Sequence, residues 1–155
     1  MPSTHELPSV DLGRALYTAA ATVRGGRSGQ GRTSDGALTV ELRPPREMGG
    51  DGGPGTNPEQ LFAIGYAACF EGALGVAARR RALDADDASI DARVHLLPTG
   101  DGRFTIAVDL DVTLPSVGET AAAIELVAAA HEICPYSNAM RGNVQLRLTA
   151  NGAPA

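Results

Sequence analysis

The chain lacks the features that nucleic-acid-binding proteins share. It has no tryptophan, aromatic residues make up only 4% of its 155 residues, and its formal net charge is −5 at pH 7. Nucleic-acid binders usually present a basic surface, and many of them stack bases on aromatic side chains. We therefore expect no nucleic-acid partner.

A membrane span and a secretion signal are also missing from the sequence. A helix needs about 20 consecutive apolar residues to cross a bilayer, and no apolar run approaches that length. Residues 1–13 do not combine a basic start with an apolar core, as a signal peptide does. Two cysteines are too few for the disulfide framework of a small secreted protein. These absences predict a cytoplasmic protein without membrane insertion.

Length and composition are those of one folded domain. Hydrophobic residues make up 43% of the chain and charged residues 20%, which is usual for globular proteins. A chain of this length can bury a sizeable core. The polar, proline-containing residues 1–14 are expected to form a flexible tail. Residues 15–152 are expected to form a single domain.

Alternation of apolar and polar residues predicts the strands. Leu38, Val40 and Leu42 alternate with polar neighbours, which is the pattern of a strand with one buried face. The same pattern places Phe104 among the inward residues of a later strand. Because each strand has one wet face, we expect antiparallel pairing. The expected strands are residues 15–23, 37–43, 89–97, 103–114 and 143–150, with a glycine-rich loop over residues 24–36.

A first helix is expected after the glycine-rich region. It has a polar cap at Thr56 or Asn57, followed by Pro58 in the first turn, where the missing N–H costs nothing. Residues 61–70 are apolar or small on every side of the helix, which is typical of a buried helix.

A second helix is expected before the last strand. Ser116 and Glu119 have the S-x-x-E spacing of a capping box, and Pro135 is expected to end the helix. The element order is then ββαββαβ, which is an α+β fold.

The two cysteines lie in different helical segments. Cys69 is in the middle of the first helix, where a free cysteine is most often an inert core residue. Cys134 is at the end of the second helix, directly before Pro135, where a thiol could move when the last turn frays. From the residues alone, the pair could be inert core residues, a structural cross-link, part of a metal site or a reactive pair.

A reactive thiol in a buried position needs a cation nearby, because burial raises its pKa. Arg24, Arg27 and Arg32 in the glycine-rich loop are candidates. Glu59, in the first turn of the helix, could hold such an arginine in a bidentate pair. Each also has a simpler explanation, since loop arginines are usually solvated and an acidic residue is favourable at a helix N-terminus.

A metal site is the competing interpretation. His131 and Cys134 are one helical turn apart, and Cys69 could be a third ligand. There is no CxxC pair and no second histidine nearby, so the ligand set is incomplete for structural zinc. His131 is equally explained as a residue favourable to the dipole at a helix C-terminus. We expect no bound metal.

Two long motifs resemble those of the organic hydroperoxide resistance proteins, within the OsmC/Ohr superfamily. They are GTNPEQLFAIGYAACF (residues 55–70) and AAHEICPYSNAMRGN (residues 129–143). The resemblance runs from about residue 16 to residue 149. It implies an OsmC/Ohr-like α+β fold, in which antiparallel sheets wrap around two central helices in an intertwined homodimer.

The resemblance also implies roles for four residues of the site. Cys69 matches the peroxidatic cysteine and Cys134 the resolving cysteine. Arg27, in GGRSG (residues 25–29), matches the arginine that activates the thiolate, and Glu59, in NPEQ (residues 57–60), matches the carboxylate that orients this arginine. The implied reaction reduces an organic hydroperoxide to an alcohol by way of a Cys69 sulfenic acid and a Cys69–Cys134 disulfide.

The substrate and the reductant follow from the same resemblance. Leu61, Phe62 and Phe70 are expected to wall an apolar pocket that favours alkyl and fatty-acid hydroperoxides over hydrogen peroxide. No bound cofactor is expected. The implied reductant is a dihydrolipoyl group on a lipoylated protein, kept reduced by a dihydrolipoyl dehydrogenase system.

Three alternative functions stay open at this point. The chain could be a related superfamily enzyme that prefers hydrogen peroxide, or a redox sensor whose disulfide signals without turnover. It could also be a non-catalytic metal- or ligand-binding domain that depends on His131.

Overall fold

The computed structural model describes residues 13–155. Of the tail expected over residues 1–14, residues 1–12 lie outside the described residues. The chain divides into two compact units, which join between Thr56 and Asn57. The single domain expected over residues 15–152 stays a prediction, and each unit is described by itself.

The first unit is built on a three-stranded antiparallel sheet in the order β1-β2-β3. The expected first strand is shorter than predicted, because Leu16 and Tyr17 are exposed and the strand begins only at Ala21. Its elements are β1 (Ala21–Arg24), the 3-10 helix η1 (Gly26–Ser28), β2 (Gln30–Thr33), β3 (Thr39–Glu41) and the 3-10 helix η2 (Arg46–Met48).

The central strand, β2, lies where the sequence predicted a loop. Its residue Gly31 is paired with Val23 on one side and with Val40 on the other. A Cβ atom at Gly31 would lie 3.4 Å from a methyl group of each valine. Gly31 therefore leaves room for the two valine side chains, so a residue typical of loops occupies the middle of a sheet.

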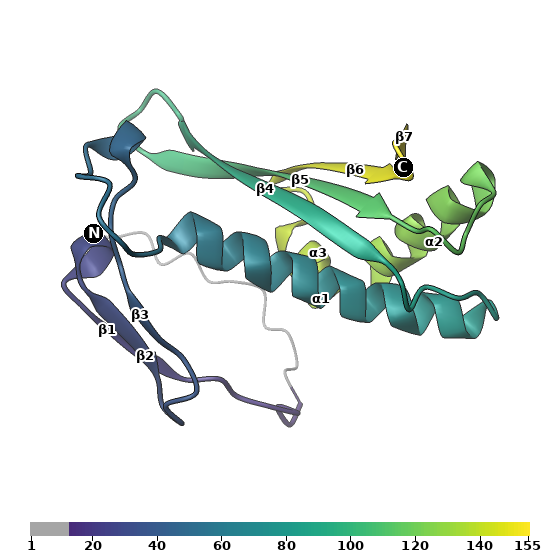
Figure 1. The fold of residues 1–155 in the computed structure, drawn as a ribbon, viewed down its shortest axis with the longest axis horizontal. Coiled ribbons are helices and arrows are strands. Elements are labelled where there is room, and N and C mark those ends of the chain that lie inside the picture. Colours follow the sequence, from purple (N-terminus) through teal and green to yellow (C-terminus); the bar gives the residue numbers. More distant parts are fainter. Residues whose placement is uncertain (1–12) are drawn as a thin grey trace. The chain divides into compact units, whose positions relative to one another are not determined.

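The second unit is a four-stranded sheet with helices packed on one face (Figure 1). The strand order is β4-β5-β6-β7. Its elements are α1 (Pro58–Arg80), β4 (Ser89–Pro98), β5 (Phe104–Thr113), α2 (Thr120–Ile133), α3 (Pro135–Met140), β6 (Gln145–Ala150) and β7 (Ala153–Pro154). The α+β class is confirmed, and β2, α3 and β7 add to the predicted element order.

The sequence predicted antiparallel pairing throughout, and this prediction is wrong for one pair of strands. β4 and β5 form the expected antiparallel hairpin, but β5 and β6 are parallel. The chain leaves the end of β5, runs back through α2 and α3, and enters β6 in the same direction. A wet face does not require antiparallel strands here, because helices cover only one face of the sheet.

The outer face of this sheet carries a network of ion pairs. The Asp109 carboxylate accepts hydrogen bonds from Arg147 at 3.1 Å and from Arg93 at 3.4 Å, and it also contacts His95. These partners, Arg147 foremost, hold the pKa of Asp109 well below its usual range. The face that alternation assigned to solvent is thus charged and internally paired.

The helix ends differ in how well the sequence predicted them. The cap at Asn57 is confirmed, since its side-chain oxygen accepts a hydrogen bond from the Gln60 N–H at 2.8 Å. The prediction of a capping box formed by Ser116 and Glu119 is wrong. Glu119 is the N-cap residue of α2 but makes no side-chain cap, and the Ser116 hydroxyl donates to Asp87 at 2.8 Å.

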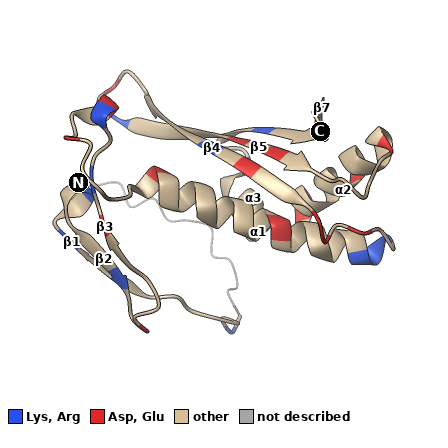
Figure 2. Cartoon of the chain, in the orientation of Figure 1, with Lys and Arg blue, Asp and Glu red and all other residues tan. Residues whose placement is uncertain are grey.

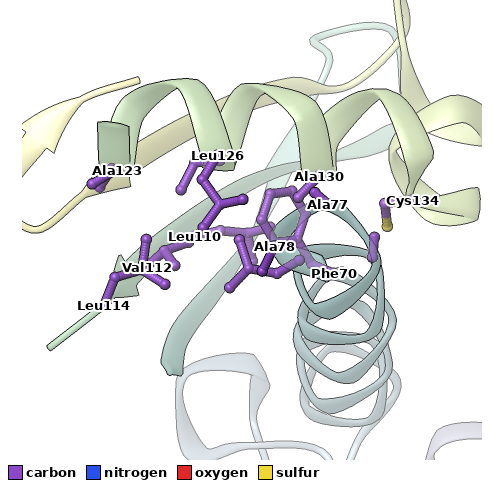
Figure 3. Close-up of a cluster of buried hydrophobic side chains, with 14 of the residues drawn as sticks. Phe70, Ala77, Ala78, Leu110, Val112, Leu114, Ala123, Leu126, Ala130 and Cys134 are labelled. Atoms are coloured by element: carbon purple, nitrogen blue, oxygen red, sulfur yellow. The ribbon is translucent and has the colours of Figure 1, made fainter. Parts of the chain in front are cut away.

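One hydrophobic core lies between the helices and the inner face of the sheet (Figure 3). Phe70 of α1, Leu110 of β5 and Leu126 of α2 have no exposed surface. Phe104, predicted to face inward, is 68% exposed because it lies at the first position of β5, beyond the reach of the core. The core is therefore formed by the far half of β5 and by the two long helices.

Residues 61–70 of α1 are apolar or small on every side, but only one face of this segment is buried within the chain. Ile64 is 69% exposed, and Ala68 and Gly72 are also exposed. By length and composition α1 could cross a membrane, which corrects the expectation that no segment would suffice. Its other face packs in the core, as a core helix of a globular domain does.

Substituting Leu126 by alanine should destabilise the fold by about 2–5 kcal/mol, because it removes a fully buried side chain and leaves a cavity. Urea denaturation of the purified variant measures the change. Leu97→Ala is the matched control: Leu97 is 41% exposed, and its loss should cost less than about 1 kcal/mol. Equal losses for the two variants would contradict the core assignment.

Candidate functional site

Cys69 lies on α1, on the side that meets the core. It is partly buried and packs against the core residues. Helix α1 begins at Pro58, directly after its N-cap Asn57, and runs without interruption to Arg80, so the position of Cys69 is fixed by a long regular helix.

Cys134 lies at the junction of two helices. It is both the C-cap of α2 and the N-cap of α3, because the next residue, Pro135, begins a new helix. Its N–H donates to the Ala130 carbonyl at 2.8 Å, and its carbonyl accepts from the Asn138 N–H at 3.0 Å. The side chain has no exposed surface. Cys134 is therefore held from both sides rather than placed on a fraying end.

The two sulfur atoms are in contact. The Cys134 thiol donates to the Cys69 Sγ at a sulfur–sulfur distance of 3.5 Å, and both thiols are free. A disulfide bond is about 2.05 Å long, so a shift of about 1.5 Å between the sulfurs would close it. We call Cys69 and Cys134 the sulfur pair. This contact distinguishes the two cysteines from unrelated core residues.

The environment of Cys69 opposes its ionisation. Burial raises the pKa of the Cys69 thiol, and the hydrogen bond and charge of Cys134 raise it further. A hydrogen bond from the backbone of Tyr136 acts in the opposite direction and lowers this pKa. A reactive thiolate at Cys69 therefore requires a positive charge in addition to these contacts.

An aromatic cluster lies beside the sulfur pair. Phe62 and Tyr66, one turn apart on α1, pack edge to face with ring centres 5.9 Å apart. The ring centre of Tyr136, on α3, lies 5.8 Å from the ring centres of both residues, and this ring also lies over Gly65. These rings join α1 to α3 next to Cys69.

The three residues predicted to wall a pocket are placed differently. Leu61 and Phe62 are partly exposed and lie in the first turns of α1. Phe70 has no exposed surface and belongs to the core. A side chain without accessible surface does not contact a substrate, so the structure places Phe70 behind the site rather than in its wall.

A buried hydroxyl pair also joins α1 to α3. The hydroxyl groups of Tyr66 and Ser137 share a hydrogen bond of 2.8 Å, and neither residue has exposed surface. Burial raises the pKa of Tyr66, while the bond to Ser137 lowers it. We call Tyr66 and Ser137 the hydroxyl pair. Sequence analysis missed both residues, although Tyr66 lies one helical turn before Cys69 and Ser137 follows Cys134 in the CPYS segment.

Glu59 and Arg27 belong to different units of the chain. Glu59 is in the first turn of α1 and is half-buried. Arg27 is the middle residue of η1 in the first unit and is also half-buried. Gly25, which precedes η1, has a φ of 79°, a left-handed conformation that glycine adopts readily. The two residues predicted to activate the thiol thus come from a tight turn and a helix start.

The described residues do not supply the set of ligands that a metal site would need. Among residues 13–155 no group of three histidine, cysteine or acidic side chains is arranged to hold a metal ion. The buried Nδ1 atom of His131 makes no hydrogen bond within that part of the chain. Burial, followed by the positive charge of Arg141, lowers the pKa of His131, which opposes the charged form that would favour the helix dipole.

The comparisons with known proteins agree with the resemblance noted in the sequence. A family model of OsmC-like proteins matches residues 49–149. An organic hydroperoxide resistance protein of Xanthomonas axonopodis pv. citri is 50% identical over 139 residues, which cover 88% of this chain and 95% of the relative.

Solved structures of similar proteins have the same fold. An organic hydroperoxide resistance protein from Vibrio cholerae, solved with captopril in one of its active sites, has a TM-score of 0.86 and 42% identity. The match covers 92% of this chain and 96% of that one. The organic hydroperoxide resistance protein OhrB of Bacillus subtilis has a TM-score of 0.79 and 46% identity, covering 87% and 98% of the two chains.

The family match extends over most of the chain, and the relatives share close to half of their residues with it over nearly their whole length. The recognition made from the two cysteine motifs is confirmed. The chain belongs to the OsmC-like family and, within it, to the organic hydroperoxide resistance proteins.

Proposed function

We propose that this chain is a thiol peroxidase that reduces organic hydroperoxides to alcohols, with Cys69 as the peroxidatic and Cys134 as the resolving cysteine. The observation that carries the proposal is the contact of the two sulfurs at 3.5 Å in a relative of organic hydroperoxide resistance proteins. Two free thiols in contact on separate elements are close enough to form a disulfide after one of them has been oxidised.

The proposed reaction has two steps. The Cys69 thiolate attacks the outer oxygen of the hydroperoxide; the O–O bond breaks, and the departing alkoxide takes up a proton to become the alcohol. Cys69 is left as a sulfenic acid. The Cys134 sulfur then attacks the Cys69 sulfur; the S–O bond breaks, and the hydroxide takes the Cys134 proton and leaves as water.

Activation of Cys69 is assigned to Arg27. Because burial and Cys134 raise the pKa of the Cys69 thiol, the thiolate needs a cation beside it, and an arginine keeps its charge in a buried site. Glu59, at the start of the same helix as Cys69, is proposed to orient the guanidinium through a bidentate pair. Both assignments come from the match of GGRSG and NPEQ to the family motifs.

The apolar surroundings support a preference for organic over hydrogen peroxide. Leu61 and Phe62 are partly exposed near the start of α1, and Phe62 packs with Tyr66 and Tyr136 beside the sulfur pair. An alkyl chain would gain about 25 cal/mol for each Å² of apolar surface that it buries there, whereas hydrogen peroxide has no such surface.

The proposed cycle closes with an external reductant. A dihydrolipoyl group, carried by a lipoylated protein and renewed by a dihydrolipoyl dehydrogenase system, would reduce the Cys69–Cys134 disulfide. It supplies two thiols that displace the protein disulfide stepwise. The chain itself would hold no cofactor, and we propose that it works in the reducing cytoplasm.

A homodimer is part of the proposal. Most of α1 is free of charge (Figure 2), and its outer face exposes Ile64, Ala68 and Gly72. An apolar helix face of this kind is covered in most proteins, and we propose that a second copy of the chain covers it. Light scattering should give twice the mass of one chain, and the mass of a single chain would contradict the dimer.

Turnover with dihydrolipoamide tests the proposed function. The wild-type protein should reduce tert-butyl hydroperoxide faster than hydrogen peroxide, and Cys69→Ser should abolish turnover because it removes the attacking sulfur. Cys134→Ser should still form one sulfenic acid at Cys69, which dimedone traps and mass spectrometry detects. Full activity of Cys69→Ser would overturn the assignment.

Removing the proposed cation should slow the first step. Arg27→Gln should lower the rate of Cys69 oxidation at pH 7 by about 10²–10³-fold, the usual cost of losing one group that stabilises a reacting anion. The deficit should shrink as the pH rises, because hydroxide then ionises the thiol, whose pKa the site raises. Stopped-flow measurements from pH 6 to 10 give both results.

The neighbouring Arg24 is the matched control for this variant. It is exposed on β1, three residues before Arg27, so Arg24→Gln removes the same charge from the same region and should leave the rate within about twofold. Glu59→Gln should give a smaller loss than Arg27→Gln. Equal rates for Arg24→Gln and Arg27→Gln would contradict the assignment.

A further inference from the structure

The sulfur pair and the hydroxyl pair connect the same two segments at the same spacing. Tyr66 precedes Cys69 by three residues on α1, and Ser137 follows Cys134 by three residues along α3. Cys134 contacts Cys69 at 3.5 Å, and Ser137 contacts Tyr66 at 2.8 Å. The two contacts are therefore parallel links, one helical turn apart, between α1 and the segment that carries Cys134.

The hydroxyl pair is the stronger of these two links in the reduced protein. A hydrogen bond to sulfur is weak, whereas two hydroxyl groups at 2.8 Å form a normal hydrogen bond. Both hydroxyl-bearing residues are fully buried, so water does not replace the bond when it breaks. The hydroxyl pair thus joins α3 to α1 one turn from the sulfur pair, in addition to the core packing between α1 and α2.

Disulfide closure requires this position to be maintained. The sulfurs must approach from 3.5 Å to about 2.05 Å with a narrow range of dihedral angles. Cys134 is linked to its own chain through Ala130 and Asn138, and α3 is a helix of only six residues. Its side-chain contacts with α1 include the Tyr136 ring and the hydroxyl pair.

We propose that Tyr66 and Ser137 are positioning residues for disulfide formation: their buried hydrogen bond holds α3 against α1 so that Cys134 captures the Cys69 sulfenic acid before a second peroxide does. This inference rests on the proposed function. When Cys134 captures the sulfenic acid, the Cys69–Cys134 S–S bond forms, the S–O bond of Cys69 breaks, and the hydroxide takes the Cys134 proton and leaves as water. In the competing step a second hydroperoxide transfers its outer oxygen to the sulfenic sulfur and leaves as alcohol, which produces a sulfinic acid.

Tyr66→Phe and Ser137→Ala test the proposal on the full-length protein. Disulfide closure is driven first by diamide, an azo oxidant that takes two electrons and two protons from the thiols and becomes a hydrazine. Closure should be slowed about tenfold in each variant, the factor expected for one buried hydrogen bond. The control is Thr149→Val, which removes a hydrogen-bonded hydroxyl on β6, outside α1 and α3, and should close at the wild-type rate.

The peroxide reaction gives the second measurement. The variants should form the Cys69 sulfenic acid as fast as the wild type, because both hydroxyls are buried away from the peroxide and Tyr66→Phe keeps the ring in the aromatic cluster. At high peroxide they should accumulate more protein with the added mass of a sulfinic acid at Cys69. Mass spectrometry of the intact protein counts both products.

The double variant separates positioning from simple stability. If the pair only stabilised the fold, removing both hydroxyls would leave no unpaired group, and the double variant would recover wild-type closure. If the pair positions Cys134, the double variant stays slow. Thermal melting of all variants identifies any that fail to fold, and Ser137→Thr, which keeps the hydroxyl, should restore closure in part.

The outcomes distinguish this inference from the proposed function. Wild-type closure rates in Tyr66→Phe and Ser137→Ala, with normal peroxide reactivity, would overturn the positioning role alone. If both variants closed slowly with diamide but Cys69 of the wild-type protein did not react with peroxide, the proposed function would be overturned and the positioning role would be kept.

Discussion

The contact between Cys69 and Cys134 is the constraint on which the arrangement of the second unit depends. It requires the middle of a long helix, α1, to meet the point where α2 ends and α3 begins. The core residues of α1, α2 and β5 hold the two long helices together. Pro135 turns the chain at Cys134, and the aromatic cluster and hydroxyl pair fix the turn against α1. Together these features surround two sulfurs that are in contact without a bond.

Burial is the main physical difficulty for the proposed chemistry. It raises the pKa of the Cys69 thiol, which disfavours the thiolate of the proposed first step. The contacts of the second unit only partly offset this effect, through the backbone of Tyr136. The proposed mechanism therefore takes its positive charge from Arg27, in the other unit of the chain.

Sequence reasoning predicted the elements that follow a regular pattern and missed those set by tertiary contacts. The alternation in β4 and the apolar run of α1 were sufficient for prediction, because each reflects burial on one element. Gly31 could not be recognised as a strand residue, since its role depends on valines of two other strands. The parallel pairing of β5 and β6 depends on the path of the chain through α2. For the site, the resemblance singled out both cysteines, but their contact and the Tyr66–Ser137 bond appeared only in three dimensions.

The central claim is that the sulfur pair forms one redox unit that responds to organic hydroperoxides. The most direct test counts free thiols in the reduced wild-type protein before and after one equivalent of tert-butyl hydroperoxide, with intact mass measured on the same samples. The account predicts that both thiols disappear together and that each chain loses the mass of two hydrogen atoms. Two thiols still present after prolonged exposure, or the loss of only one with the mass of an added oxygen, would contradict it.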